Sequence, residues 1–192
     1  MTQTPPPRIL PLGEHERDAF ANSLIAEAAG PDRVGITPNI WTTLVRHPGL
    51  FRRWIPFGGK LLAGKIPLRD REIMILRTAW RCRVAYEWSQ HSKVARAAGL
   101  TDAELSRIAE GPNSPGWTPF EAALLRCVDE LHDESSVTDE TWATLADVYD
   151  EKQLIELPML IGQYHLVAFT MNALRFELEP DAEHFPSVTD EQ

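Results

Sequence analysis

The sequence predicts an all-α fold, a multi-helix bundle, from two observations. The alternation of apolar and polar residues that marks strands is absent, and signals that start and stop helices recur throughout the 192 residues. With 43% hydrophobic and 24% charged residues, the chain can bury a sizeable core. We expect one helical domain over residues 13–180, built as one unit or as two similar ones, between a flexible tail at 1–12 and an acidic tail at 181–192.

Three helices are expected before residue 65. The first covers 14–29 and is stopped by the Gly-Pro pair that follows it. Thr37 is an N-cap residue and Pro38 suits the first position of a short second helix. A third helical segment over 50–62 contains Pro56, which removes a backbone donor and predicts a break or kink.

The middle of the chain predicts two helices with a buried stripe. Asp70 can cap a helix that runs to about Trp80, and a second helix over 85–98 ends at Gly99. No Gly or Pro separates the two helices, so periodicity alone also allows a single helix over 70–98.

Two capping boxes, at 101–104 and 118–121, each start a further helix. Helices over about 138–149 and 151–176 follow, and Pro158 should kink the last one. The acidic tail carries no helical pattern, so we expect it to be disordered or to lie over a neighbouring part of the protein.

Composition excludes several classes of partner and compartment. A net charge of −9 disfavours binding to nucleic acid or to an anionic membrane. The chain has one short basic cluster, formed by Arg77, Arg81 and Arg83. We interpret it as one solvated helix edge. The N-terminus lacks a signal-peptide pattern and no stretch reaches the roughly 18 uninterrupted apolar residues of a membrane span, which predicts a cytoplasmic protein. Cys82 and Cys127 are expected to be small buried hydrophobes.

The run YEWSQH, residues 86–91, places Glu87 and His91 four residues apart, one helical turn. His91 lies on the apolar stripe of its helix, where a polar group must be hydrogen-bonded. One interpretation is structural, with His91 bonded to a backbone carbonyl and Glu87 paired with Arg83. The other is chemical: Glu72 on the preceding helix adds a second carboxylate, and a histidine between two carboxylates can transfer protons near neutral pH.

Residues 68–101 resemble the core motif of the carboxymuconolactone decarboxylase family, which includes alkylhydroperoxidase D. In the redox branch of that family, a glutamate is followed after twelve residues by Cys-x-x-Cys-x-x-x-His. Here Glu72 and His91 match, whereas Val84 and Glu87 occupy the two cysteine positions. A valine or carboxylate cannot form a sulfenic acid or a disulfide, so the disulfide mechanism is not expected. The resemblance extends over about 40–180.

The resemblance implies the family's helical fold, no metal or cofactor, and a homo-oligomer, a trimer or a multiple of it. It implies a cofactor-independent decarboxylase, lyase or isomerase acting on a small carboxylated or lactone metabolite. The expected catalytic residues are Glu72, Glu87 and His91. The expected substrate-binding residues are Tyr86, Trp88 and His165.

Three alternatives remain open: a peroxidase-related protein that uses Cys82 or Cys127, a non-catalytic oligomeric ligand-binding protein, and a metal bound by the Glu/His cluster. The proton-transfer hypothesis also has a structural condition. On one straight helix Glu72 and His91 would lie about 28 Å apart at 1.5 Å per residue. The chain must therefore turn around 81–84.

Overall fold

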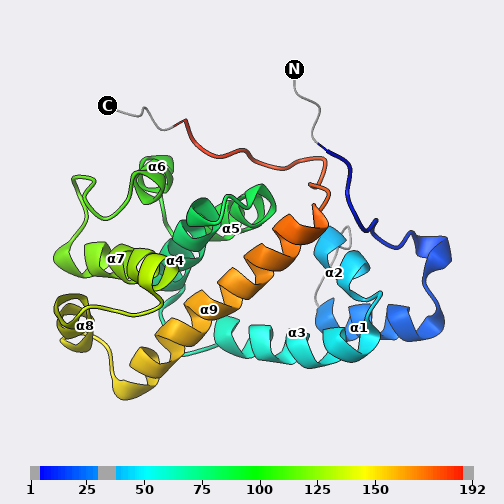
Figure 1. The fold of residues 1–192 in the computed structure, drawn as a ribbon, viewed down its shortest axis with the longest axis horizontal. Helices are drawn as coiled ribbons and strands as arrows, with labels where there is room; N and C mark the ends of the chain where they lie inside the picture. The colour runs from blue at the N-terminus through cyan, green and yellow to red at the C-terminus, as the bar shows by residue number, and fades with distance from the viewer. Residues whose placement is uncertain (1–4, 30–37, 188–192) are drawn as a thin grey trace. The chain divides into compact units, whose positions relative to one another are not determined.

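The computed structural model describes residues 5–29 and 38–187, and all regular secondary structure in these residues is helical, as the sequence predicts. The chain divides into two compact units (Figure 1). We call Met1–Ala63 with Thr170–Asp181 the N-terminal unit, and Gly64–Phe169 with Ala182–Gln192 the central unit. The expectation of a single domain over residues 13–180 stays a prediction.

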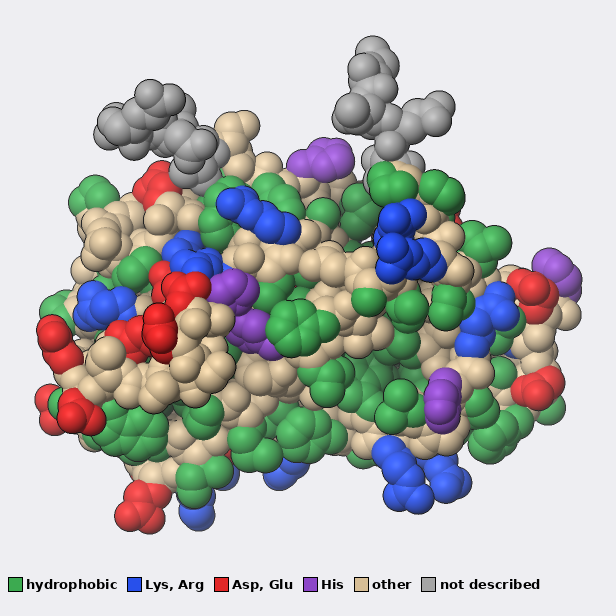
Figure 2. Space-filling model, in the orientation of Figure 1, with side chains coloured by type: hydrophobic (Ala, Val, Ile, Leu, Met, Phe, Trp, Pro, Cys, Tyr) green, Lys and Arg blue, Asp and Glu red, His purple; other side chains and the backbone are tan. Residues whose placement is uncertain are grey.

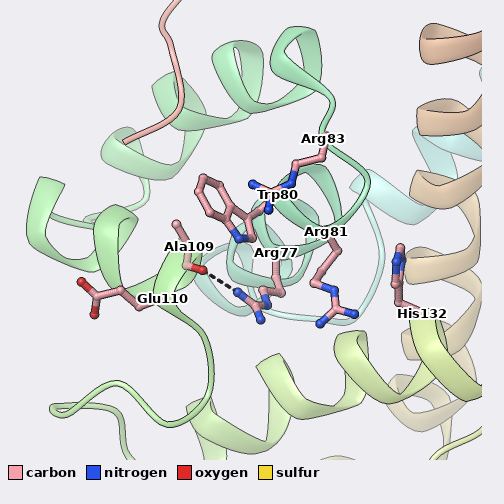
Figure 3. Close-up of a pocket in the computed structure, with 7 residues that line it drawn as sticks. All are labelled: Arg77, Trp80, Arg81, Arg83, Ala109, Glu110 and His132. Carbon is pink, nitrogen blue, oxygen red and sulfur yellow. Dashed lines mark hydrogen bonds between the residues drawn. The ribbon is translucent and has the colours of Figure 1, made fainter. Parts of the chain in front are cut away.

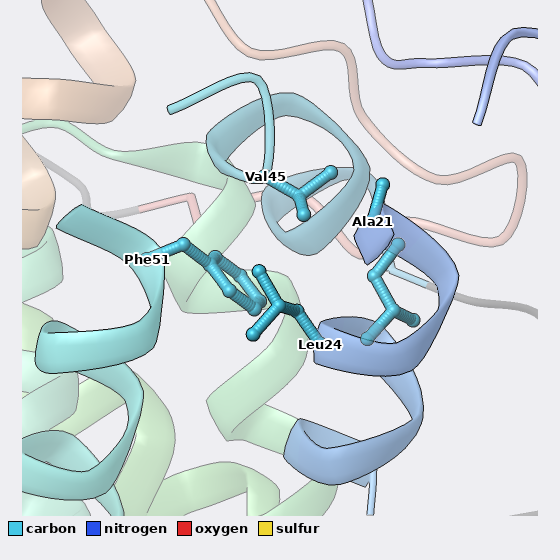
Figure 4. Close-up of a cluster of buried hydrophobic side chains, with 5 residues drawn as sticks. Ala21, Leu24, Val45 and Phe51 are labelled. Carbon is cyan, nitrogen blue, oxygen red and sulfur yellow. The ribbon is translucent and has the colours of Figure 1, made fainter. Parts of the chain in front are cut away.

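The N-terminal unit contains the 3-10 turn η1 (Glu14–Glu16) and the helices α1 (Ala19–Ala29), α2 (Asn39–Leu44) and α3 (Pro48–Leu62). Apolar side chains from the three helices and the α2–α3 junction form its core (Figure 4). The buried members are Ala21, Leu24, Ile25, Val45 and Phe51.

Several predicted boundaries in this unit are wrong for local reasons. The helix expected over 14–29 is interrupted because Arg17 is extended, and the Asp18 carboxylate then accepts the Ala21 N–H at 2.7 Å and starts α1. Pro38 precedes α2 instead of opening it, and Thr37 lies outside the described residues. Pro56 does not break α3, since it lies on an exposed face where water can satisfy the carbonyl that loses its partner.

The central unit contains α4 (Leu68–Arg81), α5 (Ala85–Ala97), α6 (Asp102–Glu110), α7 (Pro119–Glu134), α8 (Asp139–Ala146) and most of α9 (Glu151–Leu174). Its centre is α4, which packs against α5, α6 and α7 and buries every residue from 72 to 79 (Figure 1). Because α4 is enclosed on several sides, polar groups on it need partners within the protein.

Arg77 shows how α4 meets that requirement. Its guanidinium makes two bonds of 2.8 Å to the Asp129 carboxylate on α7 and donates at 2.8 Å to the carbonyls of Ile108 and Ala109 on α6. A Cβ on Gly111 would lie 2.9 Å from the guanidinium, so the glycine leaves room for it. The expectation that Arg77 belongs to a solvated helix edge is therefore wrong, because its charge is buried and paired.

The predicted helix starts are mostly confirmed. Both capping boxes are present, at Thr101 and Thr118. Gly99, with φ 91°, follows the end of α5 as expected. Asp70 is not a cap, because α4 begins earlier, at Leu68, and its carboxylate instead accepts the Tyr149 hydroxyl at 2.8 Å. The last two helices end at 146 and 174, and α9 continues through its proline without a break.

The described part of the acidic tail lies over α4 and α5. The Glu183 N–H donates to the Ser89 hydroxyl at 2.8 Å, and its carboxylate pairs with Arg96. Phe185 packs against the rings of Trp80 and Trp88, with centroids 5.3 and 5.4 Å away. Residues 182–187 are therefore ordered by one aromatic anchor and one ion pair.

The expected partner classes and the cytoplasmic location stay predictions. On the face drawn in Figure 2, basic side chains are scattered among acidic and apolar ones. By length and composition α9 could cross a membrane, but 44% of its most apolar window is buried in the protein. A core helix of a soluble protein passes the same test.

The ion pair between α4 and α6 predicts a pH-dependent stability. Burial alone would raise the pKa of Glu104, but hydrogen bonds from Arg69 and from the N–H and hydroxyl of Thr101 lower it to about 2. An unfolded glutamate has a pKa of 4.5. Glu104 therefore stabilises the fold above pH 4.5, and this contribution disappears as the pH falls towards 2.

We expect Glu104→Gln to unfold at a lower urea concentration than the wild type at neutral pH, with the difference shrinking progressively on acidification. Urea unfolding followed by circular dichroism at a series of pH values measures it. A difference that stays constant down to the lowest pH would show that ionised Glu104 does not stabilise the protein.

Candidate active site

The chain reverses between α4 and α5 over three residues. Cys82 ends α4, Arg83 takes the left-handed conformation with φ 55°, and Val84 is extended before α5. The Val84 N–H donates to the Ala79 carbonyl at 2.9 Å and the Arg83 N–H to the Trp80 carbonyl at 3.1 Å, the two bonds of a Schellman motif. This conformation costs a non-glycine residue roughly 1–2 kcal/mol. The expected turn is present, and Arg83 occupies the position where glycine is usual.

The reversal brings Glu72 and His91 together. Glu72 is fully buried, and its Oε2 lies 2.7 Å from His91 Nδ1 while its Oε1 accepts the Arg71 Nε–H at 3.1 Å. The His91 side chain is 16% exposed, so the pair reaches the surface through the imidazole. A carboxylate on Nδ1–H leaves Nε2 of a neutral imidazole as the proton acceptor. The structural interpretation, with a backbone carbonyl as the partner of His91, is wrong.

Glu87 is buried beside this pair in a different setting. Its side chain is 2% exposed and its Oε2 has no hydrogen-bond partner among the described residues. Burial raises the pKa of Glu87 well above its ordinary value, which favours the protonated form of the group. The expected ion pair between Glu87 and Arg83 is not formed, because Arg83 turns outward and stacks on Trp80 at 4.6 Å.

Tyr164 of α9 completes this group. Its ring meets His91 edge to face, with centroids 5.1 Å apart. Burial first, and then the nearby Glu87 and Glu72 carboxylates, raise the pKa of its phenol. The sequence analysis did not select Tyr164, although it precedes the selected His165 and carries a polar tip. We call four side chains the carboxylate–histidine group: Glu72, Glu87, His91 and Tyr164.

The structure places the expected substrate-binding residues in three surroundings. Tyr86 is buried within α5. Trp88 is buried in an aromatic cluster, 6.1 Å from the Trp80 ring and 5.4 Å from the Phe185 ring. His165 lies one residue beyond Tyr164 and faces another cluster. Contact between these residues and a substrate stays a prediction.

The second cluster joins α9 to α7 and to the end of α4. The Nδ1–H of His165 donates to the Ile161 carbonyl at 2.9 Å, and its Nε2 lies 3.0 Å from His132 Nδ1. Cys82 Sγ lies 3.8 Å from the same His132 nitrogen. His132 was not predicted as a functional residue, since Cys82 is 50 residues away and His165 is 33 residues away along the chain. No local spacing connects them.

Among the described residues, one group of metal-ligating side chains has donor atoms that all lie within 4.8 Å of one another: Cys82, His132 and His165. The metal site considered from the sequence, at the Glu/His cluster of α4 and α5, does not form such a group.

A pocket of about 360 Å³ opens next to His132 (Figure 3). Trp80 and the arginines of α4 and the turn line one side, and Ala109 and Glu110 of α6 line the other. Arg77 and Arg81 are paired with Asp129, and Arg81 also pairs with Asp133. The pocket therefore gives solvent access to His132 from a polar surface.

One protein-family model matches the part of the chain that contains the carboxylate–histidine pair. Residues 48–130 match the model of the Carboxymuconolactone decarboxylase family. The match contains Glu72, Glu87 and His91, and it is shorter than the range of about 40–180 over which the resemblance was expected. A search of curated protein sequences finds no significant match to the chain.

Solved structures show the same fold. A peroxidase-related protein with an alkylhydroperoxidase AhpD core, from Ralstonia eutropha JMP134, is 16% identical, with a TM-score of 0.78 over 93% of this chain and 95% of that one. Debrominase Bmp8 in complex with 2,3,4-tribromopyrrole is 17% identical, with a TM-score of 0.67 over 90% and 91%. A protein of unknown function from Agrobacterium tumefaciens is 19% identical, with a TM-score of 0.67 over 72% and 96%. The predicted AhpD-like helical fold is confirmed.

The buried carboxyl of Glu87 predicts a pH-dependent stability of the opposite sign to that of Glu104. Above pH 4.5 the unfolded chain ionises Glu87 while the folded protein keeps it protonated, so the wild type should lose stability as the pH rises. Glu87→Gln cannot ionise. We expect its free energy of unfolding, relative to the wild type, to increase as the pH rises above 4.5.

Urea unfolding at several pH values tests this expectation. Glu134→Gln is the matched control, because Glu134 is exposed at the end of α7, and its unfolding should follow that of the wild type. Parallel pH profiles for Glu87→Gln and the wild type would mean that Glu87 ionises in the folded protein.

Proposed function

We propose that the carboxylate–histidine group is the active site of a cofactor-independent acid/base enzyme, a decarboxylase, lyase or isomerase. The observation that carries the proposal is the 2.7 Å contact between fully buried Glu72 and partly exposed His91. A buried carboxylate that fixes the imidazole tautomer leaves one ring nitrogen available for proton transfer. The match of residues 48–130 to the carboxymuconolactone decarboxylase family model supports the substrate class, a small carboxylated or lactone metabolite.

In this proposal His91 Nε2 removes a proton from a carbon next to a carbonyl, and the imidazolium returns it. For a decarboxylation, the C–C bond to the carboxylate breaks, carbon dioxide leaves, and an imidazolium that has taken its proton from water protonates the carbon that keeps the electron pair. Glu72 stabilises the imidazolium through the 2.7 Å contact.

The other polar groups would stabilise charge on the substrate. Burial favours the protonated form of Glu87, whose Oε2 has no partner among the described residues, and in that form it can donate a hydrogen bond to an enolate oxygen that becomes negative. Tyr164 keeps its proton at neutral pH because its pKa is raised, and its ring fixes one face of His91. Tyr86 could supply a further hydrogen bond, as expected from the sequence.

Removing the imidazole should abolish turnover without unfolding the protein. We expect His91→Gln to lose at least about 100-fold in rate, the usual size of an acid/base contribution. Solvent deuterium incorporation into a panel of small carboxylated and lactone compounds, followed by NMR, measures turnover before the substrate is known.

The exposed His184 provides a matched control, since His184→Gln removes a surface imidazole outside the group. This variant should retain the wild-type rate. Full activity in a folded His91→Gln variant would exclude His91 as the acid/base residue.

A peroxidase-related function is the second candidate, because the Ralstonia structure is described as peroxidase-related and Cys82 lies 3.8 Å from His132. The two thiols do not favour it. Burial, together with Glu87, raises the pKa of Cys82 to about 11, and burial, together with Glu130, raises that of Cys127 to about 12. A peroxide-reducing cysteine reacts as a thiolate.

Treatment with hydrogen peroxide separates the two candidates. We expect the number of titratable thiols, measured under denaturing conditions, to be the same before and after exposure to a few equivalents of peroxide. Loss of one or both thiols, reversed by a dithiol reductant, would instead support the peroxidase-related function.

We also propose that the protein is a homo-oligomer. On α9 an apolar stripe with roughly half its side-chain surface exposed is formed by Ile155, Met159, Leu166 and Phe169. Their spacing of four, seven and three residues places them along one helix face. An exposed apolar stripe of this kind is typical of subunit contacts, which supports the trimer, or multiple of a trimer, expected from the family resemblance.

A further inference from the structure

The side chain of Cys82, at the end of α4, lies next to two imidazoles, those of His132 on α7 and His165 on α9. His165 Nδ1 faces the Ile161 carbonyl at 2.9 Å, and a carbonyl can only accept, so this nitrogen carries the proton. In the neutral imidazole, His165 Nε2 then presents a lone pair. That lone pair points at His132 Nδ1, 3.0 Å away.

His132 Nδ1 has two neighbours and at most one proton. The His165 nitrogen lies at 3.0 Å and Cys82 Sγ at 3.8 Å. A neutral Cys82 thiol can donate its S–H, whereas a deprotonated one, like an imidazole nitrogen, offers a lone pair to a metal ion. Three lone-pair donors from three separate elements thus converge, with all donor atoms within 4.8 Å of one another.

We propose that Cys82, His132 and His165 bind a divalent metal ion of the zinc type, through Cys82 Sγ, His132 Nδ1 and His165 Nε2. Zn–S bonds of about 2.3 Å and Zn–N bonds of about 2.0–2.1 Å in a tetrahedron place the donor atoms about 3.3–3.6 Å apart. The observed separations of 3.0 and 3.8 Å lie on either side of that range. The site is distinct from the carboxylate–histidine group and does not depend on its proposed function.

The surroundings of the three ligands fit a metal. The Ile161 carbonyl fixes the orientation and tautomer of His165, as outer partners of ligating histidines do. Thiolate and imidazole suit zinc among the common biological divalent ions, and they disfavour magnesium and calcium. His132 lines the pocket of about 360 Å³, which supplies the entry path (Figure 3).

The test uses the untagged full-length protein. After removal of metal by a chelator and dialysis, titration with Zn²⁺ should show one tight site per chain. Titration with Co²⁺ should produce the thiolate-to-cobalt charge-transfer absorption in the near ultraviolet, together with the visible bands of tetrahedral cobalt.

Variants assign the ligands. Cys82→Ser should remove the charge-transfer absorption. Loss of an outer partner of a metal ligand weakens binding about 10–100-fold. His132→Gln and His165→Gln remove ligands themselves, so each should weaken Zn²⁺ binding by more than that. Cys127→Ser and His184→Gln are the matched controls and should bind both ions as the wild type does. Circular dichroism confirms that each variant is folded.

The wild-type cobalt spectrum decides the proposal even if a ligand variant does not fold. Absence of the charge-transfer absorption, or Zn²⁺ affinity unchanged in the three ligand variants, would overturn the site. Since His91 is not a ligand, His91→Gln should bind Zn²⁺ as the wild type does, so failure of the metal proposal and failure of the acid/base proposal give different results.

Discussion

The reversal of the chain at Cys82, Arg83 and Val84 is the constraint on which the rest of the central unit depends. Two backbone bonds close it, and Arg83 accepts a left-handed conformation that costs a non-glycine residue roughly 1–2 kcal/mol. Because of this turn, α5 packs beside α4 instead of extending it. A pair of side chains that a straight helix would separate by about 28 Å is thereby brought to 2.7 Å.

The same turn positions the thiol of Cys82. As the last residue of α4, Cys82 points towards α7 and α9, where the two imidazoles lie. The adjacent residues Tyr164 and His165 then serve different groups, because successive side chains on a helix diverge by about 100°. The Tyr164 ring meets His91, whereas His165 meets His132. One turn and one helix therefore organise both clusters.

The two buried carboxyl groups differ in how their burial is compensated. Both oxygens of Glu72 have partners, an arginine and a histidine. Glu87 has an oxygen with no partner among the described residues, and burial raises its pKa. The site therefore places a carboxyl group with two hydrogen-bonded oxygens beside one whose burial is not compensated.

The sequence by itself determined the helical class, the capping boxes at Thr101 and Thr118, and the frame of Glu72, Glu87 and His91, because these depend on spacing within one helix or on a short motif. It did not predict the burial of Arg77 or the packing of Phe185, whose partners are remote in the sequence.

Only the tertiary structure decided which polar groups meet. Three features depend on how the helices pack. They are the turn at the non-glycine residue Arg83, the hydrogen bonding of Glu72 but not of Glu87 Oε2 among the described residues, and the approach of Cys82, His132 and His165 to within 4.8 Å. His132 lies 33 residues from His165 and 50 residues from Cys82 along the chain, and these residues become neighbours only through the packing of helices. No local sequence pattern predicts such contacts.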